Sequence, residues 1–155
     1  MMRYILFGII WLLVTAVPGS AGQKDISLPV TVLFSGQDNL THFRDEPWIL
    51  KDFEIGANAK QTEFREADSI GVLRLEAESF FDWHPAPRKQ FVLVISGRIE
   101  IKAGDGEKRI FEPGKILIAA DDLGRGHQTK PLGDQPAVIV CVAIPYNGQD
   151  TDKAK

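Results

Sequence analysis

The sequence predicts an all-β domain, built either as an antiparallel sandwich or as a small antiparallel barrel. Short apolar or alternating segments recur along the chain at intervals of roughly ten residues. Gly, Pro, Asp and Asn separate these segments, and no long stretch has the periodicity of an amphipathic helix. A chain of 155 residues is long enough for one domain with a buried core.

Each expected strand is identified by its own pattern. Segment 91–95 is apolar throughout, which is typical of a strand buried on both faces, whereas 98–102 alternates and 71–77 alternates in part. The other expected strands are 29–34, 48–50, 107–111, 115–119 and 138–144. Residues 51–68 are mixed in composition, and the pattern assigns no element there.

Turn residues divide the second half of the chain into hairpins. Ser96-Gly97 predicts a tight turn, and Gly104-Asp105-Gly106 contains the Asp-Gly pair that favours hairpin turns. Pro113-Gly114 predicts another turn, and a loop over 121–126 leads to His127. The pattern therefore predicts a series of short strands up to 144, where Pro145 ends the last one.

The N-terminus resembles a secretory signal peptide. Arg3 precedes an apolar run over 4–17, and the small residues of 18–22 would suit a signal peptidase. The run is shorter than the roughly 20 residues of a membrane span, although an uncleaved N-terminal anchor is the alternative. We expect export to the periplasm or the extracellular space, with no stable membrane span after cleavage. The mature protein is then a single domain over 23–146, with its core at 70–145 and a disordered polar tail at 147–155.

Composition excludes several classes of function. The formal net charge is −3, with the charges scattered, so nucleic acid is an unexpected partner. Cys141 is the only cysteine and lies in an apolar run, so no internal disulfide forms and the residue is expected in the core. The sequence contains no Gly-rich phosphate loop, no Cys-x-x-Cys pair and no Ser-His-Asp order, which excludes most of the enzyme classes that such motifs identify.

Two short motifs carry a family resemblance. The first has His84 and Gln90, with Gly97 following after six intervening residues, and the second has Pro113-Gly114 followed by His127. In these motifs, the stretch 81–144 resembles the cupin superfamily. The resemblance implies a small antiparallel barrel, the double-stranded β-helix or jelly roll, with the motif side chains facing its interior near the mouth.

The resemblance also implies a reduced metal site. Two of the four usual ligand positions hold His84 and His127, while the other two hold Ala86 and Gln90 in place of His and Glu. We expect His84, Gln90 and His127 to hold a divalent transition metal such as Fe, Mn, Ni or Zn, more weakly than a carboxylate site would. The alternative is a pair of neutral imidazoles in a polar pocket, acting as general acid and base.

Three further histidine or carboxylate positions are weaker candidates for the metal site. Asp121 or Asp122, on the loop before His127, could add a carboxylate ligand, or could be solvent-facing turn residues. His42, in the polar N-terminal stretch, is a candidate ligand or an ordinary surface histidine.

Candidate substrate contacts flank the first motif. A guanidinium suits a carboxylate or enolate, so Arg88 is expected to orient the substrate and, with His127, to take part in catalysis. Arg88 could instead form a surface ion pair. Trp83 and Phe91 are candidates for an apolar substrate-binding wall, or belong to the core.

Three functions remain open at this point. The first is an exported cupin that binds a small organic molecule in its barrel, with metal-dependent oxygenase or isomerase activity by resemblance to the family. The second is a non-catalytic, metal-free binding module that uses the same pocket. The third is a structural role for a homodimer formed through the sheets.

Overall fold

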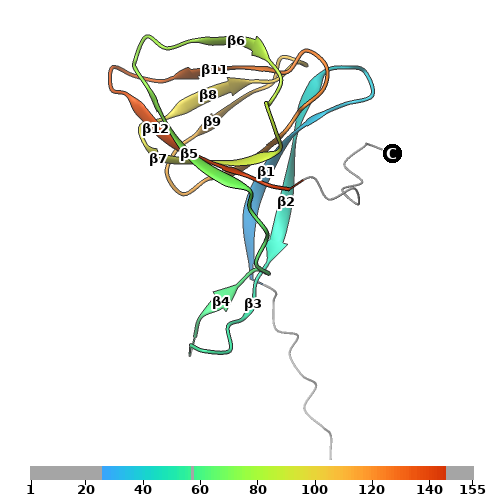
Figure 1. Cartoon of the computed structure of the whole chain (residues 1–155), viewed down its shortest axis with the longest axis vertical. Coiled ribbons are helices and arrows are strands. Elements are labelled where there is room, and N and C mark those ends of the chain that lie inside the picture. Colours follow the sequence, from blue (N-terminus) through green and yellow to red (C-terminus); the bar gives the residue numbers. More distant parts are fainter. Residues whose placement is uncertain (1–25, 57, 146–155) are drawn as a thin grey trace, which may run out of the picture.

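The computed structural model describes residues 26–56 and 58–145 (Figure 1). The expected signal peptide at 1–22 and the expected tail at 147–155 lie outside the described residues. Within the described ranges, no helical segment has the length and apolar composition to cross a bilayer.

The described residues form twelve strands. In chain order they are β1 (Ser27–Ser35), β2 (Thr41–Ile49), β3 (Lys51–Asp52), β4 (Lys60–Gln61), β5 (Ser69–Leu75), β6 (Phe81–His84), β7 (Gln90–Ser96), β8 (Ile99–Lys102), β9 (Lys108–Phe111), β10 (Ile116–Ala120), β11 (His127–Pro131) and β12 (Ala137–Ala143).

Two sheets face each other and enclose the interior of a barrel (Figure 1). One has six strands in the order β2-β1-β10-β7-β12-β5, and the other has four in the order β6-β11-β8-β9. This arrangement confirms the predicted all-β fold class and selects the jelly-roll barrel over the open sandwich. The predicted turns are also confirmed: Gly97, Gly106 and Gly114 all have positive φ angles, at 72°, 95° and 94°. Only the turn at Gly106 closes a hairpin, between β8 and β9; the expected hairpins at Gly97 and Gly114 are wrong, because there the chain crosses from one sheet to the other.

One strand pairing differs from the expected antiparallel pattern. Strand β1 pairs in parallel with β10, with Val30 opposite Ile116 and Phe34 opposite Ala120, while the other described pairs are antiparallel. The parallel pair arises because β1 lies between β2 and β10, so the N-terminal hairpin completes the sheet within its own chain.

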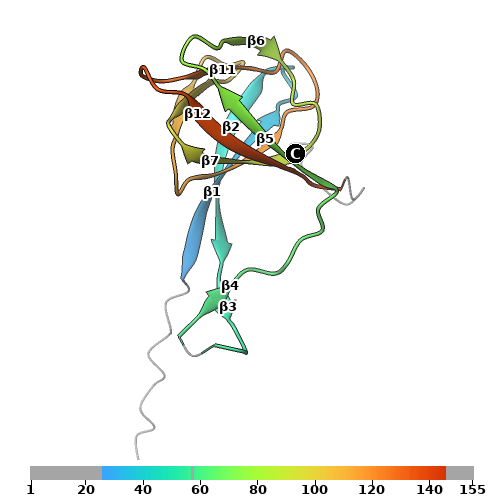
Figure 2. The ribbon, with the colours of Figure 1, turned by 60° about the vertical axis from the view of Figure 1, so that its left-hand side comes forward.

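The polar segment before Trp48 forms a strand that its sequence does not indicate. Strand β2 includes Pro47, which removes a hydrogen-bond donor, yet β2 is an edge strand and tolerates it. The start of β1 extends beyond β10 and pairs only with β2, so the two strands leave the barrel as an arm that ends in the β3–β4 hairpin (Figures 1 and 2).

The core has two parts. Inside the barrel, side chains of both sheets form one cluster, to which β1 and β2 contribute Leu33 and Phe43 in addition to the expected 70–145 region. A smaller cluster lies outside the barrel, where Val30, Val32 and Ile118 are buried and Trp48 and Phe91 pack against them. Apolar side chains therefore occupy both faces of the six-stranded sheet.

The outer apolar face continues to the edge strand β5, where it is open to solvent. Ile70 and Val72 are 72% and 68% exposed, and Ile95 on β7 is 57% exposed.

Candidate functional site

An apolar cavity of about 260 Å³ lies inside the barrel. Aliphatic side chains from both sheets form most of its wall, and the polar side chains on it are few. The residues that line it are Leu73, Leu75, Phe81, His84, Pro87, Gln90, Val92, Ile99, Ile101, Leu117, Ala119, His127, Thr129, Ile139 and Cys141. Largely apolar walls with a few converging polar groups are typical of small-molecule sites.

His84 and His127 lie side by side on the cavity wall. Strands β6 and β11 pair with these two residues in register, and their ring centroids are 4.5 Å apart at an interplanar angle of 50°. The structure thus brings together the two histidines that the sequence singled out.

Both imidazoles are held by their Nδ1 atoms. His84 Nδ1 donates to the Asp82 carbonyl oxygen at 2.6 Å, and His127 Nδ1 lies 2.6 Å from Asp121 Oδ2, to which it donates. In the described part of the chain neither Nε2 has a hydrogen-bond partner. In their neutral forms the two rings present two acceptor nitrogens, which need a shared proton, a donor from a ligand, or a metal ion between them.

Asp121 is the residue that orients His127. Its side chain is fully buried, and Oδ2 accepts from His127 and, at 3.4 Å, from the hydroxyl of Thr41. Oδ1 is buried without a hydrogen-bond partner among the described residues. A carboxylate behind an imidazole fixes its tautomer and lies ready to balance the charge of a protonated ring.

The geometry assigns different places to the two carboxylates on this loop. Asp121 lies behind His127, on the Nδ1 side of the ring, while Asp122 is exposed. Neither belongs to a group of three or more His, Cys, Asp or Glu side chains suited to a metal ion within 26–56 and 58–145.

The position of the histidine pair depends on close backbone contact at Gly126. Its φ angle is +76°, and a Cβ atom there would lie 2.0 Å from the His84 carbonyl oxygen and 2.3 Å from the Pro85 nitrogen. Only glycine lets the loop before β11 pass this close to the end of β6. The Ala86 N–H, which donates to the Asp121 carbonyl at 3.0 Å, ties the same two segments together.

The other two expected metal-ligand positions, Gln90 and Ala86, contribute little to a metal site. Gln90 lines the cavity, but its carboxamide is neutral. Ala86 is 4% exposed and belongs to the barrel core, so this position holds a packed methyl group where the family motif has an imidazole. Two imidazoles and one carboxamide are fewer strong ligands than the three that catalytic zinc sites usually have, so this donor set does not fit a tightly held metal.

The structure does not bring Trp83 and Phe91 to the cavity. Trp83 faces outward, where Arg125 lies 3.8 Å and Lys102 5.5 Å from the centre of its ring. Phe91 packs edge-on against Trp48 in the outer cluster, with ring centroids 5.6 Å apart.

Arg88 lies outside the barrel cavity, in the bend between β6 and β7. Strand β7 begins at Gln90, so Arg88 precedes the strand that carries Gln90. Its closest hydrogen-bond partner is the Ser69 hydroxyl, 3.4 Å from Nη1.

Several residues of the site were not identified from the sequence. Thr41 comes from a distant part of the chain, and Thr129 lines the cavity from β11. The two glycines Gly124 and Gly126, both with positive φ, were the available signal for a tightly constrained loop before His127.

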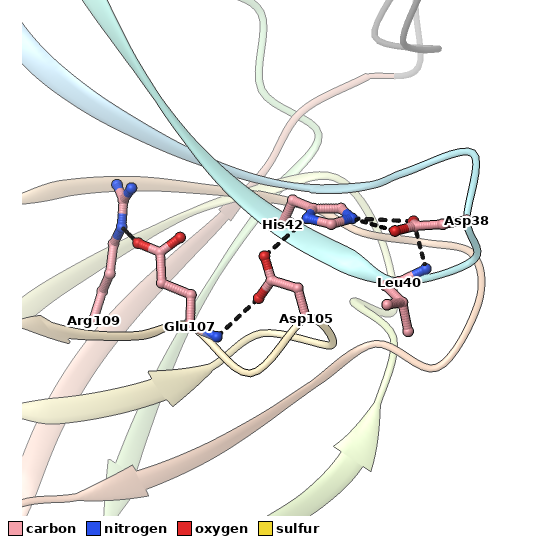
Figure 3. Close-up of polar contacts among 6 residues, drawn as sticks. All are labelled: Asp38, Leu40, His42, Asp105, Glu107 and Arg109. Atoms are coloured by element: carbon pink, nitrogen blue, oxygen red, sulfur yellow. Dashed lines mark hydrogen bonds and ion pairs between the residues drawn. The ribbon is translucent and has the colours of Figure 1, made fainter.

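His42 belongs to a separate cluster between two turns (Figure 3). Its Nε2 lies 3.0 Å from both carboxylate oxygens of Asp38, and its Nδ1 lies 2.8 Å from Asp105 Oδ2. Hydrogen bonding to Asp38 is the main cause that raises the pKa of His42, and the same contact lowers the pKa of Asp38. The protonated ring therefore joins the β1–β2 turn to the β8–β9 turn.

This cluster predicts a pH dependence of stability. Because the folded-state pKa of His42 is raised, its contribution is complete below the ordinary value of about 6.5 and is lost as the pH rises through the higher folded value. The pKa of Asp38 is lowered, so the contribution of Asp38 to stability is complete above its ordinary pKa and is lost only as the pH falls through the lower folded-state pKa. We expect the free energy of unfolding, measured with urea, to differ less between pH 5.5 and pH 8.5 in His42→Asn than in the parent protein. The effect should be modest, as for other exposed ion pairs. An unchanged difference would contradict this role for His42.

Comparison with known proteins gives similarity to solved structures alone. No family model and no curated protein matches the chain. Protein NMB1881 from Neisseria meningitidis is similar with a TM-score of 0.40 and 12% identity, over 57% of this chain and 90% of that one. The conserved protein SPY1581 of unknown function from Streptococcus pyogenes has a TM-score of 0.39 and 20% identity, over 54% and 71%.

A third similar structure is the cupin domain of Cnp3 from Schizosaccharomyces pombe. It has a TM-score of 0.40 and 16% identity, over 79% of this chain and 86% of that domain. These similarities are low, and the fold assignment rests on the chain's own strand order.

Proposed function

We propose that the barrel binds a small organic molecule that places a hydrogen-bond donor between His84 and His127. The observation that carries this proposal is the pair of Nε2 atoms without partners in the described chain, on the wall of an otherwise apolar cavity. An apolar body fills the cavity, a hydroxyl or enol group donates its proton to one Nε2 atom, and its oxygen accepts from the other ring when that ring is protonated. The volume is slightly below the range of about 300–1,000 Å³ for sites of drug-sized ligands, which favours a smaller molecule.

The same pair is suited to proton transfer on such a ligand. His127, oriented by Asp121, accepts the proton of a bound enol hydroxyl at Nε2, and His84 in its protonated form lies close enough to give a proton to the enol carbon, so that the keto form results. Tautomerisation of an enol is the reaction class that needs no further group. Without a reactive ligand the cavity is a binding module, and export of the protein remains our expectation from its N-terminal sequence.

Two aromatic probes, one with and one without a hydrogen-bond donor, test this proposal. Phenol and anisole share an aromatic ring, but only phenol can donate to an imidazole. We expect His84→Ala and His127→Ala to weaken phenol binding by about tenfold, as for the loss of one hydrogen bond, and to leave anisole binding little changed. Isothermal titration calorimetry on the folded variants measures both affinities.

The control variant removes a methylene from the same cavity. Ile139→Val should change the affinities of phenol and anisole by the same factor, because Ile139 provides only apolar contact. Equal effects of the histidine variants on the two probes would overturn the proposed role of the pair. Metal content of the same samples tests the predicted cofactor: a near-stoichiometric transition metal that His127→Ala removes would replace the metal-free pair with a metal site.

The open apolar face supports a second candidate function, in which two copies assemble through the outer surface of the six-stranded sheet. Ile70, Val72 and Ile95 are exposed there, and an exposed apolar patch is typical of an interaction surface. We expect a chain that begins at residue 23 to be dimeric by light scattering, and Val72→Lys to make it monomeric. A monomeric parent chain would contradict this assembly.

A further inference from the structure

A second hollow of about 250 Å³ adjoins the barrel cavity through a shared wall. Pro87, Gln90 and Cys141 line both spaces, and Ser69, Gly71 and Arg88 line only the outer one. The two hollows therefore lie on either side of the same side chains, where β5, β12 and the start of β7 meet.

Gly71 leaves this part of the wall thin. It pairs with Cys141 on β12. Along β5 it is on the same face as Leu73 and Leu75, which line the barrel cavity. A Cβ atom at position 71 would have no neighbour within 4 Å, so open space lies where the other inward positions of the strand carry leucine. Burial raises the pKa of the Cys141 thiol, which keeps this side of the wall neutral.

Arg88 places a positive charge at the outer end of this opening. Within the described chain the guanidinium has no carboxylate partner, and its contact with the Ser69 hydroxyl is long, at 3.4 Å. An arginine without a carboxylate partner beside an apolar passage is suited to a ligand carboxylate, because the planar guanidinium binds it with two parallel hydrogen bonds.

From this arrangement we infer a lateral carboxylate-binding site at Arg88, which opens through the Gly71 gap into the barrel cavity. The inference rests on the proposed function and names its ligand class: small carboxylic acids with an apolar body and a hydrogen-bond donor at the far end. The carboxylate binds Arg88, the body passes Gly71 and Cys141, and the donor reaches the histidine pair. Ligand size is then limited by the side chain at position 71.

A hydroxyaryl acid and its neutral amide test the site. We expect 3-(4-hydroxyphenyl)propionate to bind the mature protein at least about tenfold more tightly than 3-(4-hydroxyphenyl)propionamide, as for a hydrogen bond to a charged group. Arg88→Gln should reduce the affinity for the acid to that for the amide and leave the amide unchanged. Gly71→Val should also remove the advantage of the acid, because its side chain fills the opening. Arg98→Gln, at an exposed arginine that lines neither hollow, is the matched control.

The outcomes separate this inference from the function it rests on. An acid-to-amide ratio that Arg88→Gln or Gly71→Val leaves unchanged overturns the lateral site, as does failure of the acid to bind. The phenol and anisole comparison still decides whether the histidine pair binds a donor. Gly71→Val is expected to fold, since it adds a β-branched residue to a strand in open space.

Discussion

Gly126→Ala is expected to lower the free energy of unfolding by on the order of 4 kcal/mol, which combines a strained left-handed backbone with severe overpacking. The contact is with main chain, since the new Cβ would lie 2.0 Å from the His84 carbonyl oxygen and 2.1 Å from its carbon. Backbone atoms cannot rotate away as a side chain can, so β6 must separate from the loop. Total stabilities are about 5–15 kcal/mol, so a loss of this size would remove between about a quarter and most of the total stability.

A second glycine provides the control for Gly126. Gly106 has a φ angle of +95°, but a Cβ atom there would meet nothing within 4 Å. Gly106→Ala should therefore cost only the backbone term of about 1–2 kcal/mol. Urea unfolding of the two variants separates strain from contact, and equal losses would show that the approach of Gly126 to His84 is not close in solution.

Asp121→Ala is expected to have the second largest effect, because it leaves two buried donors without an acceptor. His127 Nδ1 and the Thr41 hydroxyl both donate to Asp121 Oδ2, and an unsatisfied buried group costs about 1–3 kcal/mol. We expect the free energy of unfolding to fall by about 3 kcal/mol and phenol binding to weaken as in His127→Ala.

Asp121→Asn separates structural support from positioning of the ring. The amide keeps the size of the side chain and one acceptor oxygen, so most of the stability should return. The nitrogen chemical shifts of His127 report its tautomer directly. We expect a protonated Nδ1 in the native chain and a mixture of tautomers in Asp121→Ala. An unchanged Nδ1 tautomer in Asp121→Ala would remove Asp121 from the positioning role.

Much of the fold could be predicted because the strands in the second half of the chain have clear patterns. The alternation over 98–102 corresponds to β8, and the glycines at 97 and 106 correspond to the turns at its two ends. Strand β2 was missed because Pro47 and several charged side chains are acceptable at a sheet edge, where one side of the backbone needs no partner.

The site was predictable only in part. His84 and His127 were found from their motif positions, but neighbouring residues depended on which way each strand faces. Segment 91–95 is apolar at every position, so no alternation with polar residues shows which of its side chains face the barrel interior. Phe91 faces the outer cluster with Trp48. Asp121 and Asp122 are equivalent in sequence. The bend of a loop with two positive-φ glycines decides that Asp121 is the buried one.

The strand order of the six-stranded sheet has a consequence for the folding rate. The last described strand, β12, lies between β7 and β5, and the first described strand, β1, lies between β2 and β10. Neither strand can pair until segments that are distant in sequence have met. The entropy of closing long loops is therefore lost before most of the stabilising contacts form. The barrel is therefore expected to fold on the millisecond-to-second timescale of nonlocal β proteins. A ribosome-bound chain that lacks β12 cannot yet complete the sheet.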